Sequence, residues 1–595
     1  MKSKQLQQLT LVGLVFLLAA IAIVIREPSA NQYEISLYGA YPGYFWLLVV
    51  GAMFVGAIVI LGSARISKDR TWVFGALLLL LTNALVLLLP YIRGYMLYGT
   101  SDPLSHVGFV VDIINNGNIS GNRYPPMHLL ALTIADATGL EIMTIGLVLP
   151  VVFSVMCFGG MYYVLAYLFD SRKQVLFGLP FVLLPILGGA HVGFRPYDLS
   201  LMLVPILLYL FFKSQRMSTP AIRTMLVVAL TAVMLYHPLT ALFLVGVSLL
   251  YLAGRYVPQV HDQHDRPTGF VSLSAAIFLA WYTTMSGILI RFDSVYETLF
   301  GTEEGSAPVE GYTSAAEEAS PALTDMLQTA IFQYGVDFVL FGLGYLFIGL
   351  AVLLLFQRRF VPTSYITMLG GTLLVFSLGG LAFLLMDMIV PHTRPFQLAK
   401  IAAVILAGQL FYLLIHRWNI TQNRSTLRAG AQIVMVVTIA LLIALSVMSL
   451  YPSPYGTSEN YQVTEMEVTG SEWVIDHGNT EHQMTGLGTI SHRRFHHALY
   501  GTNAPQSFER IGLPDHFNYI EHRYLSDSYQ SNTYLTINEA GRIVYPEVFP
   551  DYRENWRFTP EDFEQLDRDR STQRIYDNGD YDQYRIDVPS PGEED

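Results

Sequence analysis

Residues 44–62 read YFWLLVVGAMFVGAIVILG, a run without a single charged side chain. A helix of about 20 apolar residues is long enough to cross the hydrocarbon core of a bilayer. Arg65, Lys68 and Arg70 follow at once, and basic residues are enriched on the cytoplasmic side of membrane spans. This stretch therefore predicts a transmembrane helix whose C-terminal end faces the cytoplasm.

The same pattern recurs along the chain of 595 residues, which is 52% hydrophobic and only 14% charged. This composition is typical of a protein with many membrane spans. Nine runs are long, and four shorter ones must also cross if the basic loops are to alternate sides. We therefore expect an α-helical polytopic membrane protein with about 13 transmembrane helices. The runs are 9–25, 44–62, 72–91, 141–169, 175–190, 197–212, 222–236, 239–253, 269–290, 336–356, 364–389, 396–415 and 430–450.

The basic residues between these runs predict the orientation of the chain. With alternating spans, 17 Lys and Arg side chains fall on one face and six on the other. The positive-inside rule then places the N-terminus in the cytoplasm and both residues 101–130 and the C-terminal tail outside the cell membrane. The six outer arginines are Arg26, Arg93, Arg123, Arg195, Arg291 and Arg394.

The tail, residues 452–595, has the composition of a separate soluble domain. It holds 26 acidic and 11 basic side chains, a balance that disfavours nucleic acid as a partner. Its patterns predict helices at 463–478 and 558–566, a strand-turn-strand at 534–548 and a hairpin at 574–586. We expect a transmembrane domain over 1–451 and a small extracellular α/β domain over 452–595.

A polar island, SDPLSHVGFVVDIINNGNISGNRYPPMHLL at residues 101–130, stands out in the first long outer loop. Apolar side chains recur at helical spacing, which predicts an amphipathic helix over 103–116 lying along the outer membrane surface. Asp102 would cap that helix and Pro103 would start it, which is by itself a sufficient structural reason for both residues. The apolar positions are Leu104, Val107, Val111 and Ile114.

The island resembles the outer loop of the membrane-embedded GT-C glycosyltransferases, including archaeal-type mannosyltransferases, that use polyprenyl (dolichyl) phosphate sugars. The similarity lies in Asp102, the short helix with His106, and RYPPMH at 123–128 before the next span. It implies that Asp102 is the general base or orients the acceptor. The tail lacks a WWDYG motif, its nearest match being EWVIDHG at 472–478, so the oligosaccharyltransferase branch is not expected.

The chemistry of such a transfer suggests which other residues bind substrate. A leaving lipid phosphate needs cations, and the guanidinium fork matches phosphate oxygens. Lys400 lies within a span, where an ionisable group is functional by default. Snorkelling to the interface would also explain Lys400, and contact with lipid headgroups would also explain the arginines. The sequence contains no pair of acidic residues that would suggest a metal site, and no cofactor is expected. The candidate substrate-binding residues are His106, Arg123, Tyr124, His128, Arg195, Arg394 and Lys400.

Two other histidine segments have simpler interpretations. His237, before Pro238, is expected to be a packed and hydrogen-bonded side chain. HRRFHH at 492–497 has no further ligand at metal spacing, which favours an exposed helix face.

The sequence therefore predicts an enzyme that transfers one sugar, with mannose expected, from a dolichyl or polyprenyl phosphate donor to an extracellular glycan, as in protein N-glycosylation. A surface-polysaccharide ligase or polymerase uses similar donors and is one alternative. A polytopic transporter is the other, and it would carry charged residues near the middle of the membrane. The expected partners are the lipid-linked donor, a glycan or glycoprotein acceptor and the bilayer.

Overall fold

The structure is a computed structural model that describes residues 2–589 except 67, 218, 257–268, 284–320, 387–389, 418–423, 489, 507 and 520. Every predicted apolar run coincides with a helix over at least part of its length. The ends of the runs 269–290 and 364–389, together with Arg291, lie outside the described residues.

Nine helices of the described chain are long and apolar enough to cross a membrane. Large apolar side chains on them face outward, such as Leu47 (73% exposed) and Phe338 (64% exposed). Apolar surface of this extent is expected where lipid replaces water as the solvent. The nine are α1 (Ser3–Arg26), α2 (Gly43–Ser63), α7 (Ile142–Leu168), α9 (Pro196–Arg216), α11 (Pro238–Arg255), α15 (Leu323–Phe356), α16 (Ser364–Leu385), α17 (Thr393–Tyr412) and α18 (Arg424–Met448).

The remaining four predicted spans are represented by shorter helices: α3 (Trp72–Leu87), α8 (Arg172–Val182), α10 (Pro220–Tyr236) and α12 (Phe270–Tyr282). At 1.5 Å per residue, the 11 residues of α8 rise only about 16 Å. Regular helix ends at Val182, shortly before Pro185, and a 3-10 turn follows at Gly188–His191. By length and composition, nine helices of the described residues could therefore span a membrane, and the other four predicted spans are not confirmed.

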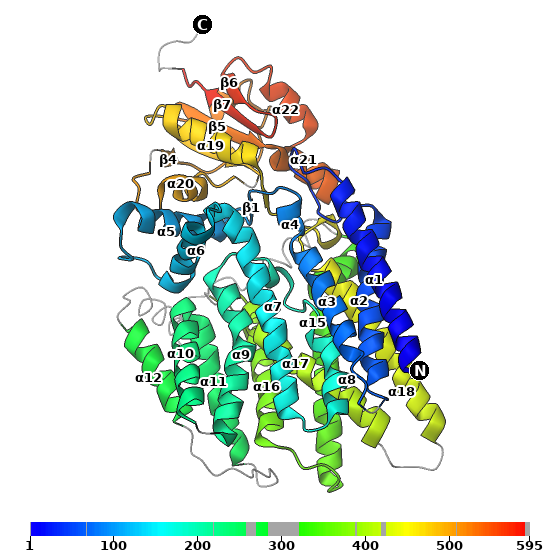
Figure 1. The fold of residues 1–595 in the computed structure, drawn as a ribbon. Coiled ribbons are helices and arrows are strands. Elements are labelled where there is room, and N and C mark those ends of the chain that lie inside the picture. Colours follow the sequence, from blue (N-terminus) through cyan, green and yellow to red (C-terminus); the bar gives the residue numbers. More distant parts are fainter. Residues whose placement is uncertain are drawn as a thin grey trace.

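Two short helices, α5 (Asp102–Asn116) and α6 (Pro125–Thr138), lie between the helical bundle and the C-terminal domain (Figure 1). The helix predicted over 103–116 is thus present, but its buried face differs from the predicted one. Leu104, Val107, Val110 and Ile113 are buried, whereas Ile114 is 55% exposed. The face shifts because α5 is covered by a second helix from the C-terminal domain, α20 (His492–Tyr500).

The C-terminal domain is built on a mixed five-stranded sheet in the order β4-β3-β5-β7-β6. Strand β3 runs parallel to both β4 and β5, while β7 is antiparallel to β5 and to β6. The predicted hairpin is therefore confirmed. The strands are β3 (Gln483–Leu487), β4 (Glu509–Arg510), β5 (Thr533–Asn538), β6 (Thr572–Asp577) and β7 (Tyr581–Ile586).

The helices of this domain follow their capping signals. The helices predicted at 463–478 and 558–566 are confirmed as α19 (Glu465–His477) and α22 (Pro560–Leu566), and both begin at capping boxes. The strand-turn-strand predicted at 534–548 is wrong in its second half, which forms α21 (Glu539–Val548). The Asn538 side chain accepts a hydrogen bond from the Gly541 N–H, so a residue read as part of a turn caps a helix instead.

A two-stranded sheet ties the tail to the bundle. β1 (Leu97–Tyr98), just after α4 (Leu89–Ile92), pairs antiparallel with β2 (Gln462–Val463). Beside it the Tyr33 hydroxyl donates to the Asn460 carbonyl at 2.8 Å. The N-terminus lies at the opposite end of the bundle from this domain (Figure 1).

Candidate functional site

Asp102 is the first residue of α5, not its cap. Ser101 occupies the N-cap position and makes no capping side-chain bond, so the predicted N-cap role of Asp102 is wrong. Its carboxylate instead pairs with a guanidinium from the C-terminal domain, Asp102 Oδ1 lying 3.0 Å from Arg494 Nη2. The Asp102 side chain remains 55% exposed. A carboxylate here is also favoured by the helix dipole.

Arg494 links Asp102 to a second contact between α5 and α20. Its Nη1 donates to Ser105 Oγ at 2.8 Å, and Ser105 Oγ lies 2.9 Å from His497 Nδ1. Because Ser105 already accepts from Arg494, its O–H is free to donate to His497. Burial, reinforced by the nearby Arg493 and Arg494 cations, lowers the pKa of His497 to about 4, which keeps this ring a neutral acceptor.

The two helices approach closely at a glycine. A Cβ at Gly108 would lie 2.3 Å from the carbonyl oxygen of His497. Further along α5, the buried Asp112 carboxylate accepts hydrogen bonds from Thr502 N (2.9 Å), Asn503 N (3.2 Å) and the Thr502 hydroxyl.

The prediction that HRRFHH forms an exposed helix face is therefore wrong, because one side of α20 packs on α5. Phe495 of this segment is 1% exposed. Single-sequence patterns carry no signal for this docking, since the two helices lie almost 400 residues apart in the chain.

The structure brings His106 of α5 and His128 of α6 into contact. His106 Nδ1 lies 3.1 Å from His128 Nε2, and His128 Nδ1 lies 2.8 Å from Asn122 Oδ1. Both rings are buried, and desolvation lowers the pKa of His106 to about 3 and that of His128 well below its usual value. The Tyr124 ring packs edge-on against His106.

Arg195 lies at the start of α9 and pairs with Asp198, which was not among the predicted site residues. Its Nε is 2.6 Å from Asp198 Oδ2, with side chains 45% and 2% exposed respectively. The Asp198 carboxylate, with a smaller effect from Asp102, raises the pKa of Arg195. The Arg195 side chain is thus partly exposed, and the charge of Asp102 acts on it. The signal was present in HVGFRPYD at 191–198, where Asp198 follows Arg195 by one helical turn.

The remaining candidate residues differ in their surroundings. The guanidinium of Arg394 lies over the Tyr197 ring at 4.7 Å, and Tyr197 donates to the Arg394 carbonyl. Arg123 is exposed and belongs to none of the ion pairs between described residues. His237 caps α11 by accepting from Leu239 N at 3.2 Å, which confirms its packed, hydrogen-bonded role.

Lys400 is not open to a phosphate. Its Nζ lies 3.2 Å from Asp337 Oδ2, and both side chains are only 10% exposed. The pair joins α17 to α15 inside the bundle. Asp337 was overlooked because it lies at the second position of an apolar run, where an isolated acid gives no hint of its partner.

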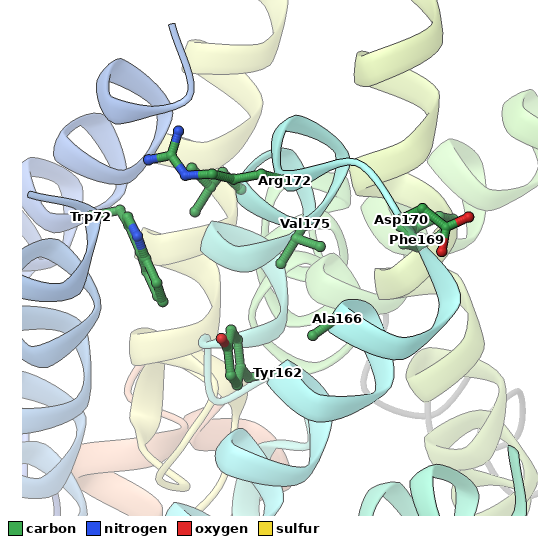
Figure 2. A pocket seen from close by; sticks show the side chains of 8 residues that line it. Trp72, Tyr162, Ala166, Phe169, Asp170, Arg172 and Val175 are labelled. Carbon is green, nitrogen blue, oxygen red and sulfur yellow. The ribbon is translucent and has the colours of Figure 1, made fainter. Parts of the chain in front are cut away.

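One cavity lies away from these residues. It measures about 260 Å³ and is lined from α3, α7 and α8. Figure 2 shows Trp72 and Tyr162 on one side of the cavity. The Arg172 guanidinium is turned toward the loop between α2 and α3, where it donates to Ile66 O at 3.0 Å. This cavity is at the opposite end of α7 from α6 and has no contact with Asp102.

No protein-family model matches this chain, and no curated protein matches it significantly. Within the described residues, no three His, Cys, Asp or Glu side chains are grouped to hold a metal ion. The candidate site therefore consists of a half-exposed carboxylate, two guanidiniums and a histidine pair, placed where the bundle meets the C-terminal domain.

Proposed function

We propose that this protein is a membrane glycosyltransferase of the GT-C type, which transfers one sugar, with mannose expected, from a dolichyl or polyprenyl phosphate to an extracellular glycan acceptor. One observation carries the proposal: the half-exposed Asp102 carboxylate lies 3.0 Å from the Arg494 guanidinium, where the bundle meets the C-terminal domain. The transfer needs a proton acceptor and a cation near one another.

In the proposed reaction, a hydroxyl oxygen of the acceptor attacks the anomeric carbon as the bond from that carbon to the phosphate oxygen breaks. Asp102 takes the hydroxyl proton, and the lipid phosphate leaves with the bonding electron pair. Arg195 balances the charge that develops on the phosphate. Arg494 orients the Asp102 carboxylate through its 3.0 Å contact. Arg394 and Arg123 are proposed to guide the anionic headgroup.

The same proposal includes the orientation of the chain. The α5 end of the bundle, with the C-terminal domain, would face outside the cell, and the N-terminus would face the cytoplasm, as the loop charges predict. The donor would then enter from the outer leaflet, at the height of Asp102.

A transporter remains a second candidate because of one specific observation. The Lys400–Asp337 ion pair is buried between apolar helices, and such pairs mark ion or proton pathways in membrane proteins. A purely structural pair would explain the same geometry, so the two functions must be separated by experiment.

The direct experiment compares surface glycans of the source cells with and without this gene. The proposal predicts glycans shortened by one hexose in the deletion strain, restored by wild-type protein. Membranes holding the protein should also transfer label from dolichyl phosphate mannose to those shortened glycans. Loss of long polymer would indicate a ligase or polymerase instead, and unchanged glycans would contradict any role in glycan assembly.

A further inference from the structure

Asn122, His128 and His106 are linked by hydrogen bonds. The structure determines which atom donates and which accepts in each of them. The Tyr124 backbone N–H donates to Asn122 Oδ1 at 3.0 Å. A backbone N–H is only a donor, so the atom that faces it must be the amide oxygen and not the amide nitrogen. This contact fixes the orientation of the Asn122 side chain.

The fixed oxygen in turn orders both imidazole rings. His128 Nδ1 lies 2.8 Å from Asn122 Oδ1, and because oxygen there can only accept, Nδ1 must carry the proton. A neutral His128 then has a bare Nε2, which accepts from His106 Nδ1 at 3.1 Å. A neutral His106 that is protonated at Nδ1 has an unprotonated Nε2.

Neutrality of the two rings is consistent with their surroundings. His106 is 7% exposed and His128 is fully buried, and desolvation disfavours their charged forms. The charged and titratable groups that act on the His106 ring are Arg195, His237 and Arg494, and each lowers its pKa further.

Within the part of the chain that the structure describes, no protein group donates to the unprotonated His106 Nε2. Among the described residues, the hydrogen bonds of the His106 ring comprise only the one at Nδ1. A bare ring nitrogen attracts a hydroxyl proton and repels a phosphate oxygen, since both the nitrogen and that oxygen carry lone pairs.

We propose that His106 Nε2 accepts a hydrogen bond from a hydroxyl group of the sugar substrate, and that Asn122 and His128 are positioning residues that hold His106 in this tautomer. The inference rests on the proposed glycosyl transfer and refines it. It assigns hydroxyl recognition to His106 and leaves the phosphate to the arginine side of the site.

Two substitutions of His106 separate this role from simple packing. Glutamine places its amide near the position of Nε2, so an oxygen can still accept from the hydroxyl, whereas asparagine reaches only the position of Nδ1 and keeps the contact with His128. We expect His106→Asn to lower kcat/KM for labelled dolichyl phosphate mannose by about 10-fold or more and His106→Gln to retain clearly more transfer. Equal activity, or better transfer by the asparagine variant, would overturn the proposal.

A second measurement tests the tautomer without any enzymatic assay. Nitrogen-15 NMR of histidine-labelled full-length protein in lipid nanodiscs, with His106→Gln used to assign the resonance, should show His106 protonated at Nδ1 and bare at Nε2. Asn122→Leu should allow the other tautomer. A proton on Nε2 in the wild-type protein would overturn the inference even if transfer is observed, whereas absence of transfer with the predicted tautomer would overturn the proposed function and the substrate assigned to His106.

Discussion

Arg494 in the C-terminal domain lies 3.0 Å from the Asp102 carboxylate at the start of α5. The candidate site is therefore shared between the helical bundle and a domain that follows it in the chain. Docking of α20 on α5 sets the orientation of Asp102, so a change that loosens this interface should impair the site without touching any of its charged groups.

Gly108→Ala tests that dependence. The added Cβ would meet the His497 carbonyl at 2.3 Å, and overpacking of this kind costs about 1–3 kcal/mol. We expect a lower thermal midpoint, faster proteolysis near residues 451–465 and reduced transfer. Gly349→Ala in α15 is the matched control, because its Cβ would meet nothing within 4 Å. Equal behaviour of the two variants would argue against a close α5–α20 contact.

Asp112→Asn tests the second contact of this interface. The buried Asp112 carboxylate accepts three hydrogen bonds. An amide nitrogen cannot accept, so at least one donor would be left unpaired at a cost of about 1–3 kcal/mol. We expect a lower thermal midpoint than in Asp136→Asn, which alters an exposed acid on α6.

The buried pair Lys400–Asp337 makes a different prediction. Lys400→Met alone would leave a buried carboxylate without a partner, and breaking such a pair costs about 3–5 kcal/mol. Lys400→Met combined with Asp337→Leu should recover most of that stability, measured as the thermal midpoint in detergent. If the double variant is stable and still transfers sugar, the pair is structural; a stable but inactive double variant would favour a role in transport or catalysis.

Stability should fall on acidification because of the buried histidines. The pKa of His106 is lowered to about 3 in the folded protein, so between about pH 6.5 and pH 3 the unfolded state binds the extra proton. Each such histidine then removes about 1.4 kcal/mol per pH unit over this window. We expect a lower thermal midpoint at pH 5 than at pH 7, with a shallower slope in His106→Gln. A midpoint that rises on acidification would contradict neutral burial.

The sequence predicted the parts of the fold that local chemistry determines. Apolar runs located the helices of the bundle, and the helices predicted at 463–478 and 558–566 are present as α19 and α22. Asn538 shows the limit of that approach, because the same residue type favours both a turn and a helix cap. The length of α8 was also overestimated, since hydrophobicity continues past Val182 although regular helix ends there.

Only the part of the candidate site that lies within residues 101–130 could be predicted from the sequence. Asp102, His106 and His128 belong to one polar island, and His106 and His128 are in contact, as their proximity in sequence suggested. Arg494 and Asp337 were missed because each meets its partner across a long stretch of chain, and no local periodicity encodes such a contact. Lys400 was identified as unusual, but its neutralisation by Asp337 depends on how α15 packs against α17.

Asp102→Asn provides the most direct test of the account. Asparagine keeps the shape of the side chain but cannot take a proton, and loss of a general base typically lowers rates by about 100- to 10,000-fold. We predict normal expression and membrane insertion, with transfer from labelled dolichyl phosphate mannose nearly abolished, while Asp136→Asn transfers like the wild-type protein. Near-normal transfer by the Asp102→Asn protein would contradict the proposal that this carboxylate accepts the proton.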